Sequence, residues 1–230
     1  MVISPRDKYF LSGMAYLKLG KPSDGPVSRH LNRRVSSLVT THIIVKTSLT
    51  PNQLTVLIFL FSMLAFPAYL SGLYWLGALI AQLGSMLDGC DGELARLKNM
   101  STPQGAFYDS VLDRYVDIAT TAALTARLAL DYPQLAVTVW SAGLAAIAGA
   151  LMTSYSWHLL KDMTGDLDVK WPSLLADSRD VRTLLISLAS GLVYLDPLIP
   201  VAALAWTALT SHTKTIYRLL AVHKLQSTSQ

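Results

Sequence analysis

Four aspartates, with glycines and an arginine at fixed spacings among them, are the residues of this chain best suited to chemistry. They are Asp88, Asp91, Asp109 and Asp113, in the stretch DGCDGELARLKNMSTPQGAFYDSVLD. The stretch joins two very apolar segments, and a carboxylate at the end of a lipid-embedded helix is costly unless it is paired, solvated or metal-bound. We therefore expect these four side chains to form a functional site that holds a cation.

The spacing of the four aspartates predicts how they meet in space. Asp88 and Asp91 are three residues apart, and Asp109 and Asp113 are four apart, so each pair shares one face of a helix. The short connection 98–104 makes the two helices antiparallel neighbours, which brings all four carboxylates to one pocket. Such oxygen ligands suit Mg²⁺ or Mn²⁺, and four of them suit two ions about 3.5 to 4 Å apart. Zinc is disfavoured, because Cys90 is the sole cysteine and the five histidines have no paired spacing.

A divalent ion beside carboxylates indicates phosphate chemistry, since the ion bridges diphosphate oxygens and offsets charge on a leaving group. Gly92 and Gly105 remove side chains where a helix end approaches a substrate or another helix closely. Arg96, about one turn beyond Asp91, can donate a fork of hydrogen bonds to phosphate. Asp113 lies deepest of the four and is our candidate for the base that deprotonates an attacking hydroxyl.

Composition indicates the class of protein that positions these residues. Of 230 residues, 52% are hydrophobic and 15% charged, and the mean hydropathy is +0.39, which is typical of a membrane protein. We expect an all-α membrane fold in which residues 1–49 form a cytoplasmic N-terminal segment and residues 50–230 a membrane domain. A membrane span needs roughly 17 to 25 residues, and the fifth apolar stretch, about 15 residues long, is expected to begin earlier, near Arg179. The six expected spans are Leu54 to Ser71, Leu73 to Leu94, Ala106 to Leu130, Pro133 to Leu160, Val181 to Leu195 and Leu198 to Ser211.

The placement of Lys and Arg predicts the orientation of these spans, because cytoplasmic loops are enriched in both. Eight precede the first span, two follow the second, four join the fourth to the fifth, and three close the chain. The connections at the other ends of the spans contain no Lys or Arg. Arg127, near one of these connections, is the single charge that disagrees with the expected orientation. We therefore expect a multi-pass protein of the cell membrane with both termini and the acidic stretch on the cytoplasmic side. The net charge of +4 then reflects the orientation of the spans in the membrane and the binding of anions. A nucleic-acid partner is not expected.

Residues 26–48 are expected to form an amphipathic helix at the membrane interface. Apolar residues recur there at steps of three or four, while three arginines take other positions on the helical wheel. An ordinary soluble helix packed on the bundle is the alternative interpretation, and both place the segment on the cytoplasmic face. The apolar set is Val27, Leu31, Val35, Leu38, Val39 and Ile43, and the arginines are Arg29, Arg33 and Arg34.

The acidic stretch resembles the signature of the CDP-alcohol phosphotransferase family, with a match at every fixed position. The pattern reads Asp88-x2-Asp91-Gly92-x2-Ala95-Arg96-x8-Gly105-x3-Asp109-x3-Asp113. The resemblance implies that a CDP-linked alcohol is cleaved, that CMP leaves, and that an acceptor hydroxyl takes the phosphoryl-linked group. It further implies that Asp88, Asp91, Asp109 and Asp113 hold the metals and that Asp113 is also the base. The CDP part would contact Gly92, Ala95 and Arg96, together with Asp88, Asp91 and Gly105.

Three further segments indicate which substrates to expect. The segments KPSDGPVSRHLNRRVS, TPNQLT and SRDVR resemble the membrane domain of archaeal di-myo-inositol phosphate phosphate synthases, which join CDP-inositol to inositol 1-phosphate. Those domains are often fused to a soluble nucleotidyltransferase. Residues 1–46 leave no room for one, so we expect a separate enzyme to supply CDP-inositol. The competing interpretation is a phospholipid synthase that takes CDP-diacylglycerol or CDP-archaeol as donor and inositol phosphate or another polar alcohol as acceptor.

Both interpretations need a site for the acceptor, which is a phosphorylated polyol or polar alcohol. The candidates for it are Arg114, Asp117, Lys161, Arg179 and Arg182, although the cations among them could instead contact lipid headgroups. The small-residue run SAGLAAIAGALMTS in the fourth span favours close helix or dimer packing, and we expect a homodimer. A divalent-cation transporter is the alternative class. It is disfavoured because transport sites lie near the bilayer midplane on broken helices, whereas these carboxylates lie at one rim.

Overall fold

A computed structural model describes residues 25–164 and 177–228 of the chain. Within these two ranges the protein consists of helices and turns, with no strand, so the expected all-α class is confirmed for the described residues. Residues 1–24 of the expected N-terminal segment and residues 165–176 between the fourth and fifth spans lie outside this description. The helices run in the order η1 Ser28–Asn32, α3 Arg33–His42, η2 Ile44–Lys46, α4 Pro51–Met63, α5 Ala65–Leu70, α6 Tyr74–Leu87, α7 Gly89–Leu97, α8 Pro103–Asp131, η3 Pro133–Leu135, α9 Ala136–Thr164, α10 Arg179–Gly191 and α11 Leu198–Thr228.

Local sequence explains where most of these helices begin. Thr50 caps α4, because its hydroxyl accepts from the Gln53 amide while the Gln53 side chain accepts from the Thr50 amide. Thr102 caps α8 in a similar way, accepting from the Gly105 amide, and Pro occupies the first position of both helices. These caps fix the start of α8, which carries Asp109 and Asp113, and of α4, which packs against α7 and α8.

Two of the expected spans are interrupted. The first divides into α4 and α5 at Leu64, because Pro67 has no amide proton to donate to the carbonyl of residue 63. The second divides into α6 and α7 at Asp88, the first aspartate of the acidic stretch. The fifth begins at Arg179 as expected but ends at Gly191, and the sixth continues past Ser211 to Thr228.

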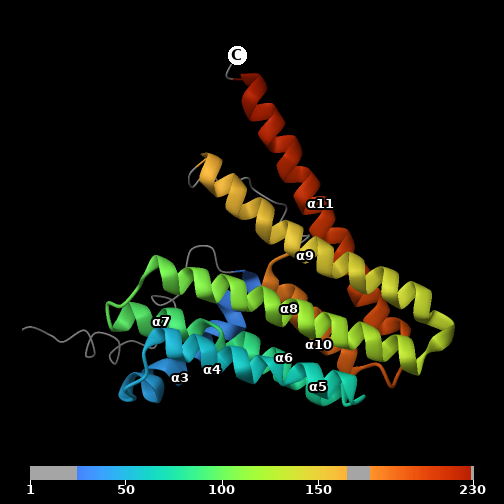
Figure 1. Ribbon diagram of the computed structural model, residues 1–230, viewed down its shortest axis with the longest axis horizontal. Helices are drawn as coiled ribbons and strands as arrows, with labels where there is room; N and C mark the ends of the chain where they lie inside the picture. Colours follow the sequence, from blue (N-terminus) through green and yellow to red (C-terminus); the bar gives the residue numbers. More distant parts are fainter. Residues whose placement is uncertain (1–24, 165–176, 229–230) are drawn as a thin grey trace, which may run out of the picture.

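α4, α6 and α8 run roughly along one direction, α11 is inclined steeply to them, and the C-terminal ends of α9 and α11 extend beyond the rest of the bundle (Figure 1). α9 packs against α8 and α11, while α10 packs against α6 and α11. By length and apolarity, two helical segments of the described chain qualify to cross a membrane, Pro51–Leu70 and Pro133–Met163. α6 and α10 are shorter, with 14 and 13 residues, and the first half of α8 carries the charges of the acidic stretch.

The main apolar core fills the part of the bundle remote from the acidic stretch. It includes Tyr69, Leu124, Leu128 and Leu204. At this end Arg127 forms a 2.6 Å ion pair with Asp131, and Asp131 also accepts from the Tyr74 hydroxyl at 2.7 Å. The charge that was discordant in the sequence is therefore neutralised locally. A smaller apolar cluster of Ile44, Leu54, Cys90 and Leu94 lies under the N-terminal helices.

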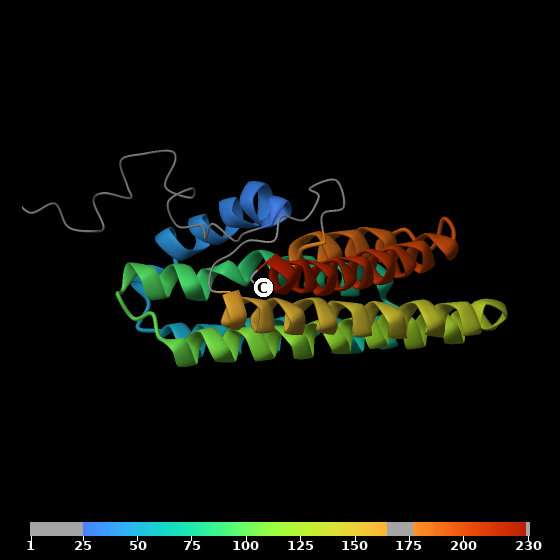
Figure 2. The ribbon, with the colours of Figure 1, turned by 90° about the horizontal axis from the view of Figure 1, so that it is seen from above.

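α3 packs against α6 and α7 on one side of the bundle (Figure 2). Its buried residues are polar: Arg33, Ser36, Ser37 and Thr40. The helical wheel predicted the amphipathic pattern of residues 26–48, and α3 packs on the bundle through its polar face. Leu31 of η1, Leu38 of α3 and Ile43 directly after α3 are 40%, 60% and 62% exposed, so these apolar side chains point away from the bundle, as an interfacial helix requires. Val39 of α3 packs partly against the smaller apolar cluster.

Candidate active site

Three of the four motif carboxylates form a tight group. Asp88 comes from the break between α6 and α7, and Asp109 and Asp113 come from successive turns of α8. One oxygen atom of each lies within 4.8 Å of the others. Oxygen atoms about 2.0 to 2.2 Å from a small divalent cation are separated by roughly these distances. The donor set therefore fits Mg²⁺ or Mn²⁺, and it contains none of the sulfur or imidazole ligands that zinc prefers.

Asp91 lines the same cavity as the other three aspartates but lies outside that group of three. Its carboxylate accepts a 2.5 Å hydrogen bond from the Thr55 hydroxyl of α4 and another from the Gly92 amide. Thr55 and Asp91 are both buried. The four carboxylates converge on one cavity, of about 250 Å³, and α4 supplies a polar contact that holds one of them.

Arg179, the first residue of α10, makes ion pairs with several of these carboxylates. Its guanidinium group contacts Asp88 and Asp113 at 3.0 Å each and Asp117 at 3.1 Å. Three acids from two parts of the chain therefore share one cation, which offsets their mutual repulsion. Arg114 contacts Asp117 at 3.4 Å and Asp113 at 3.8 Å. The base candidate Asp113 is thus flanked by two guanidinium groups.

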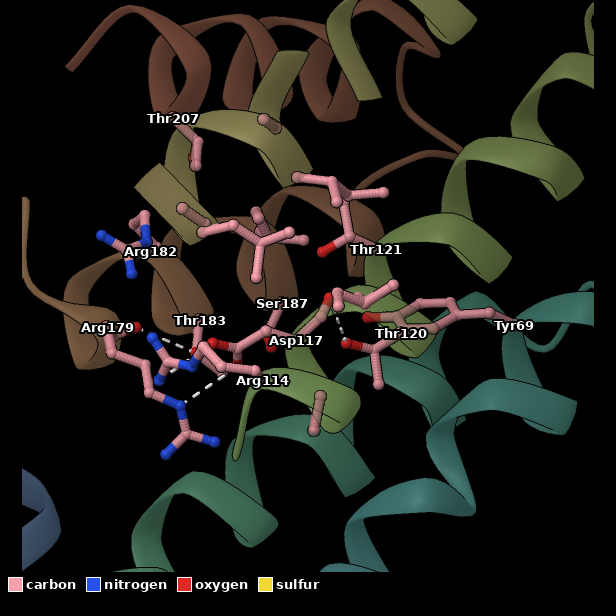
Figure 3. Close-up of a pocket in the computed structure, with 17 residues that line it drawn as sticks. Tyr69, Arg114, Asp117, Thr120, Thr121, Arg179, Arg182, Thr183, Ser187 and Thr207 are labelled. Carbon is pink, nitrogen blue, oxygen red and sulfur yellow. Dashed lines mark hydrogen bonds and ion pairs between the residues drawn. The ribbon is translucent and has the colours of Figure 1, made fainter. Parts of the chain in front are cut away.

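A small cavity of about 50 Å³ extends from this cationic group into the bundle. In Figure 3, Arg114, Arg179 and Arg182 gather with Asp117 at one end of it, and the hydroxyl side chains of Thr120 and Thr121 lie toward the other. Arg182 is buried and pairs at 3.0 Å with Asp177. Four of the five acceptor candidates therefore line one cavity. The fifth, Lys161, is exposed near the end of α9 and does not line it.

A further cavity, of about 180 Å³, lies on the other side of Asp91 and Asp109. The close approach expected at Gly105 is present, because a Cβ atom there would lie 3.1 Å from the Asn52 side-chain oxygen. Asn52 and Thr55 belong to the first turns of α4 and were not among the sequence candidates, since TPNQLT indicated only a helix start and a resemblance. The motif residues that line the cavity are Asp91, Gly92, Ala95, Arg96, Gly105 and Asp109.

The family profile for CDP-alcohol phosphatidyltransferase matches residues 48–216 of this chain, which include every residue of the acidic motif. This chain belongs to that family. The match identifies residues 48–216 as a CDP-alcohol phosphotransferase domain, of a family that is integral to the membrane. The transporter interpretation has no support from these similarities.

Curated relatives of this family are similar over much of the chain. A protein of Rubrobacter xylanophilus named bifunctional IPC transferase and DIPP synthase is 36% identical over 98% of this chain and 49% of its own length. The protein of that name from Aquifex aeolicus is 40% identical over 79% of this chain and 41% of its own length. An archaetidylinositol phosphate synthase of Pyrococcus horikoshii is 35% identical over 47% of this chain and 53% of its own length. This chain spans about half the length of these relatives, or less.

Solved structures of the phosphatidylinositol phosphate synthase from Mycobacterium tuberculosis share the fold. The structure with CDP-DAG bound aligns with a TM-score of 0.67 at 21% identity, covering 81% of this chain and 92% of that one. The complex with manganese and citrate aligns with the same TM-score at 20% identity, covering 84% and 88%. At this identity the similarity establishes the helical architecture alone.

Proposed function

We propose that this chain transfers the phosphoinositol group of CDP-inositol to inositol 1-phosphate, which gives di-myo-inositol phosphate phosphate and releases CMP. The observation that carries this proposal is the 36% identity, over 98% of the chain, to a protein named for IPC transfer and DIPP synthesis. The cationic group beside Asp113 supports it, because an acceptor that is itself a phosphate ester needs positive charge close to the base.

In the proposed reaction the donor lies along the cavity between α4, α7 and α8. Arg96 and the backbone at Gly92, Ala95 and Gly105 would contact the CDP part. Asp88, Asp91, Asp109 and Asp113 would hold one or two divalent ions, which would offset the charge of the diphosphate. These assignments use the residues that line two adjoining cavities, with Asp91 and Asp109 common to both.

Asp113 would accept the proton of the acceptor hydroxyl. The acceptor oxygen then forms a bond to the donor phosphorus atom next to the inositol, and the bond from that phosphorus to the CMP oxygen breaks. Arg114, Arg179 and Arg182, which share a cavity with Asp117, would hold the acceptor phosphate. Lys161 would not contact the acceptor, since it lies outside that cavity.

A lipid donor is the second candidate function. Two observations favour it: the similarity to an archaetidylinositol phosphate synthase and the fold shared with a phosphatidylinositol phosphate synthase that binds CDP-DAG. In that case CDP-diacylglycerol or CDP-archaeol would occupy the same nucleotide cavity, and inositol phosphate or another polar alcohol would be the acceptor.

A panel of donors and acceptors tests the two candidates. Purified protein would be given CDP-inositol, CDP-diacylglycerol or CDP-archaeol, each with inositol 1-phosphate, and CMP release would be measured. We expect the fastest release with CDP-inositol. Release with the lipid donors alone would reject the soluble product and establish the second candidate.

We further propose that the six helical segments α4–α5, α6–α7, α8, α9, α10 and α11 cross the membrane as one domain, residues 50–230, with both termini and the acidic site at the cytoplasmic face. The support is the distribution of Lys and Arg in the sequence and the two segments that qualify by length and apolarity. A homodimer is proposed from the small-residue run of α9. Reporter fusions at residues 72 and 196 test the topology, which predicts both on the far side of the membrane.

A further inference from the structure

Glu93 is a fully buried carboxylate inside the motif helix α7, at a position that the family signature leaves variable. Its partners come from α3. The hydroxyls of Ser36 and Thr40 donate to it at 2.6 and 2.9 Å, and Arg33 donates through Nη1 at 3.1 Å. A buried charge is strongly unfavourable without such partners. α3 therefore supplies the groups that allow α7 to carry this charge.

The same arginine reaches the helix break at Asp88. Arg33 Nη1 also lies 3.3 Å from the carbonyl oxygen of Gly89, the first residue of α7. A Cβ atom at position 89 would collide with this guanidinium group, so the contact depends on glycine there. Arg33 also lines the cavity of about 250 Å³ into which Asp88 and Asp113 point.

Polar contacts carry much of the attachment of α3 to the bundle. In most amphipathic helices of globular proteins the apolar stripe faces the core and provides the packing energy. Leu38 of α3 and Leu31 of the preceding η1 face outward, and the buried face of α3 is made of Arg33, Ser36, Ser37 and Thr40. Loss of the contacts to Glu93 should therefore loosen α3 on α7.

We propose that Arg33 is a positioning residue, which acts through Glu93 and the Gly89 carbonyl to fix the break between α6 and α7 and with it the direction of the Asp88 carboxylate. We name these contacts the Arg33–Glu93 clamp. The inference rests on the proposed function, because it assumes that Asp88 holds a metal ion. Its consequence is that a helix on the surface of the bundle determines the metal affinity of the site.

The test uses the full chain and measures Mn²⁺ affinity by electron paramagnetic resonance, together with the melting temperature. Arg33→Met alone leaves Glu93 charged and buried and is expected to lower the melting temperature. The double variant Arg33→Met with Glu93→Gln removes both charges and keeps an amide that Ser36 and Thr40 can contact. We expect it to fold with a melting temperature close to that of the wild type, yet to bind Mn²⁺ about tenfold to a hundredfold more weakly.

Two controls separate the possible outcomes. Arg127→Met breaks an ion pair at the remote end of α8 and should leave Mn²⁺ affinity unchanged, which supports the inference. A folded double variant with wild-type Mn²⁺ affinity would overturn the Arg33–Glu93 clamp and leave the proposed function standing. Wild-type Mn²⁺ affinity in Asp109→Asn would instead overturn the proposed metal site, and the inference with it.

Discussion

The hydrogen bond between Thr55 and Asp91 should contribute directly to metal binding. Replacing Thr55 by valine removes the hydroxyl and preserves the shape of the side chain, in a site where both residues are buried. The Thr55 hydroxyl lies 2.5 Å from the Asp91 carboxylate, a distance typical of a strong bond to a charged group. Without it the Asp91 carboxylate can rotate away from the cavity that it shares with Asp88 and Asp113.

The size of the effect follows from the strength of such bonds. A hydrogen bond to a charged group contributes about 1.5 to 3 kcal/mol, and about 1.4 kcal/mol corresponds to a tenfold change in affinity. We therefore expect Thr55→Val to weaken Mn²⁺ binding by about tenfold to a hundredfold, which agrees with typical losses on removing the partner of a metal ligand.

Titration of the purified variants with Mn²⁺ checks this prediction. Thr55→Ser is the matched control, since it keeps the hydroxyl and loses only a methyl group, and it should bind Mn²⁺ nearly as tightly as the wild type. CMP release at saturating metal should recover in part for Thr55→Val. Wild-type Mn²⁺ affinity in Thr55→Val would refute the reasoning, because Asp91 would then need no support from α4.

Two further predictions concern the base and the acceptor. Asp113→Asn should abolish CMP release while CDP-alcohol binding, measured by calorimetry, is retained; turnover at the wild-type rate would reject Asp113 as the base. Arg179→Ala should raise the KM for the acceptor phosphate about tenfold or more, since a charge-assisted contact is lost. Lys161→Met should leave that KM unchanged, because Lys161 lies outside the cavity. Equal effects of the two substitutions would contradict the assignment of the acceptor site.

Local signals in the sequence predicted much of the architecture. The three- and four-residue spacings of the aspartates and the short connection after α7 predicted that Asp88 would lie beside Asp109 and Asp113. The fifth span was expected to begin near Arg179, where α10 begins. These features depend on residues close together in the chain, for which local spacing is sufficient evidence.

The features that the sequence did not predict depend on contacts between residues far apart in the chain. Arg179 is 62 positions from Asp117, and nothing in its neighbourhood indicated that it would reach three carboxylates. The helical wheel of residues 26–48 gave the two faces of α3 but not which one docks, because the deciding partner, Glu93, lies 60 positions from Arg33. A buried polar face opposite an exposed apolar one is a tertiary feature, which periodicity alone does not determine.

The central claim is that the four-aspartate motif performs metal-dependent transfer from a CDP-alcohol. The most direct test measures CMP release by purified protein given CDP-inositol and inositol 1-phosphate, after removal of divalent ions with EDTA and again after addition of Mg²⁺ or Mn²⁺. We predict no release without the ions, recovery with either of them, and no recovery in Asp109→Asn. Release that persists in EDTA, or full recovery in Asp109→Asn, would contradict the claim.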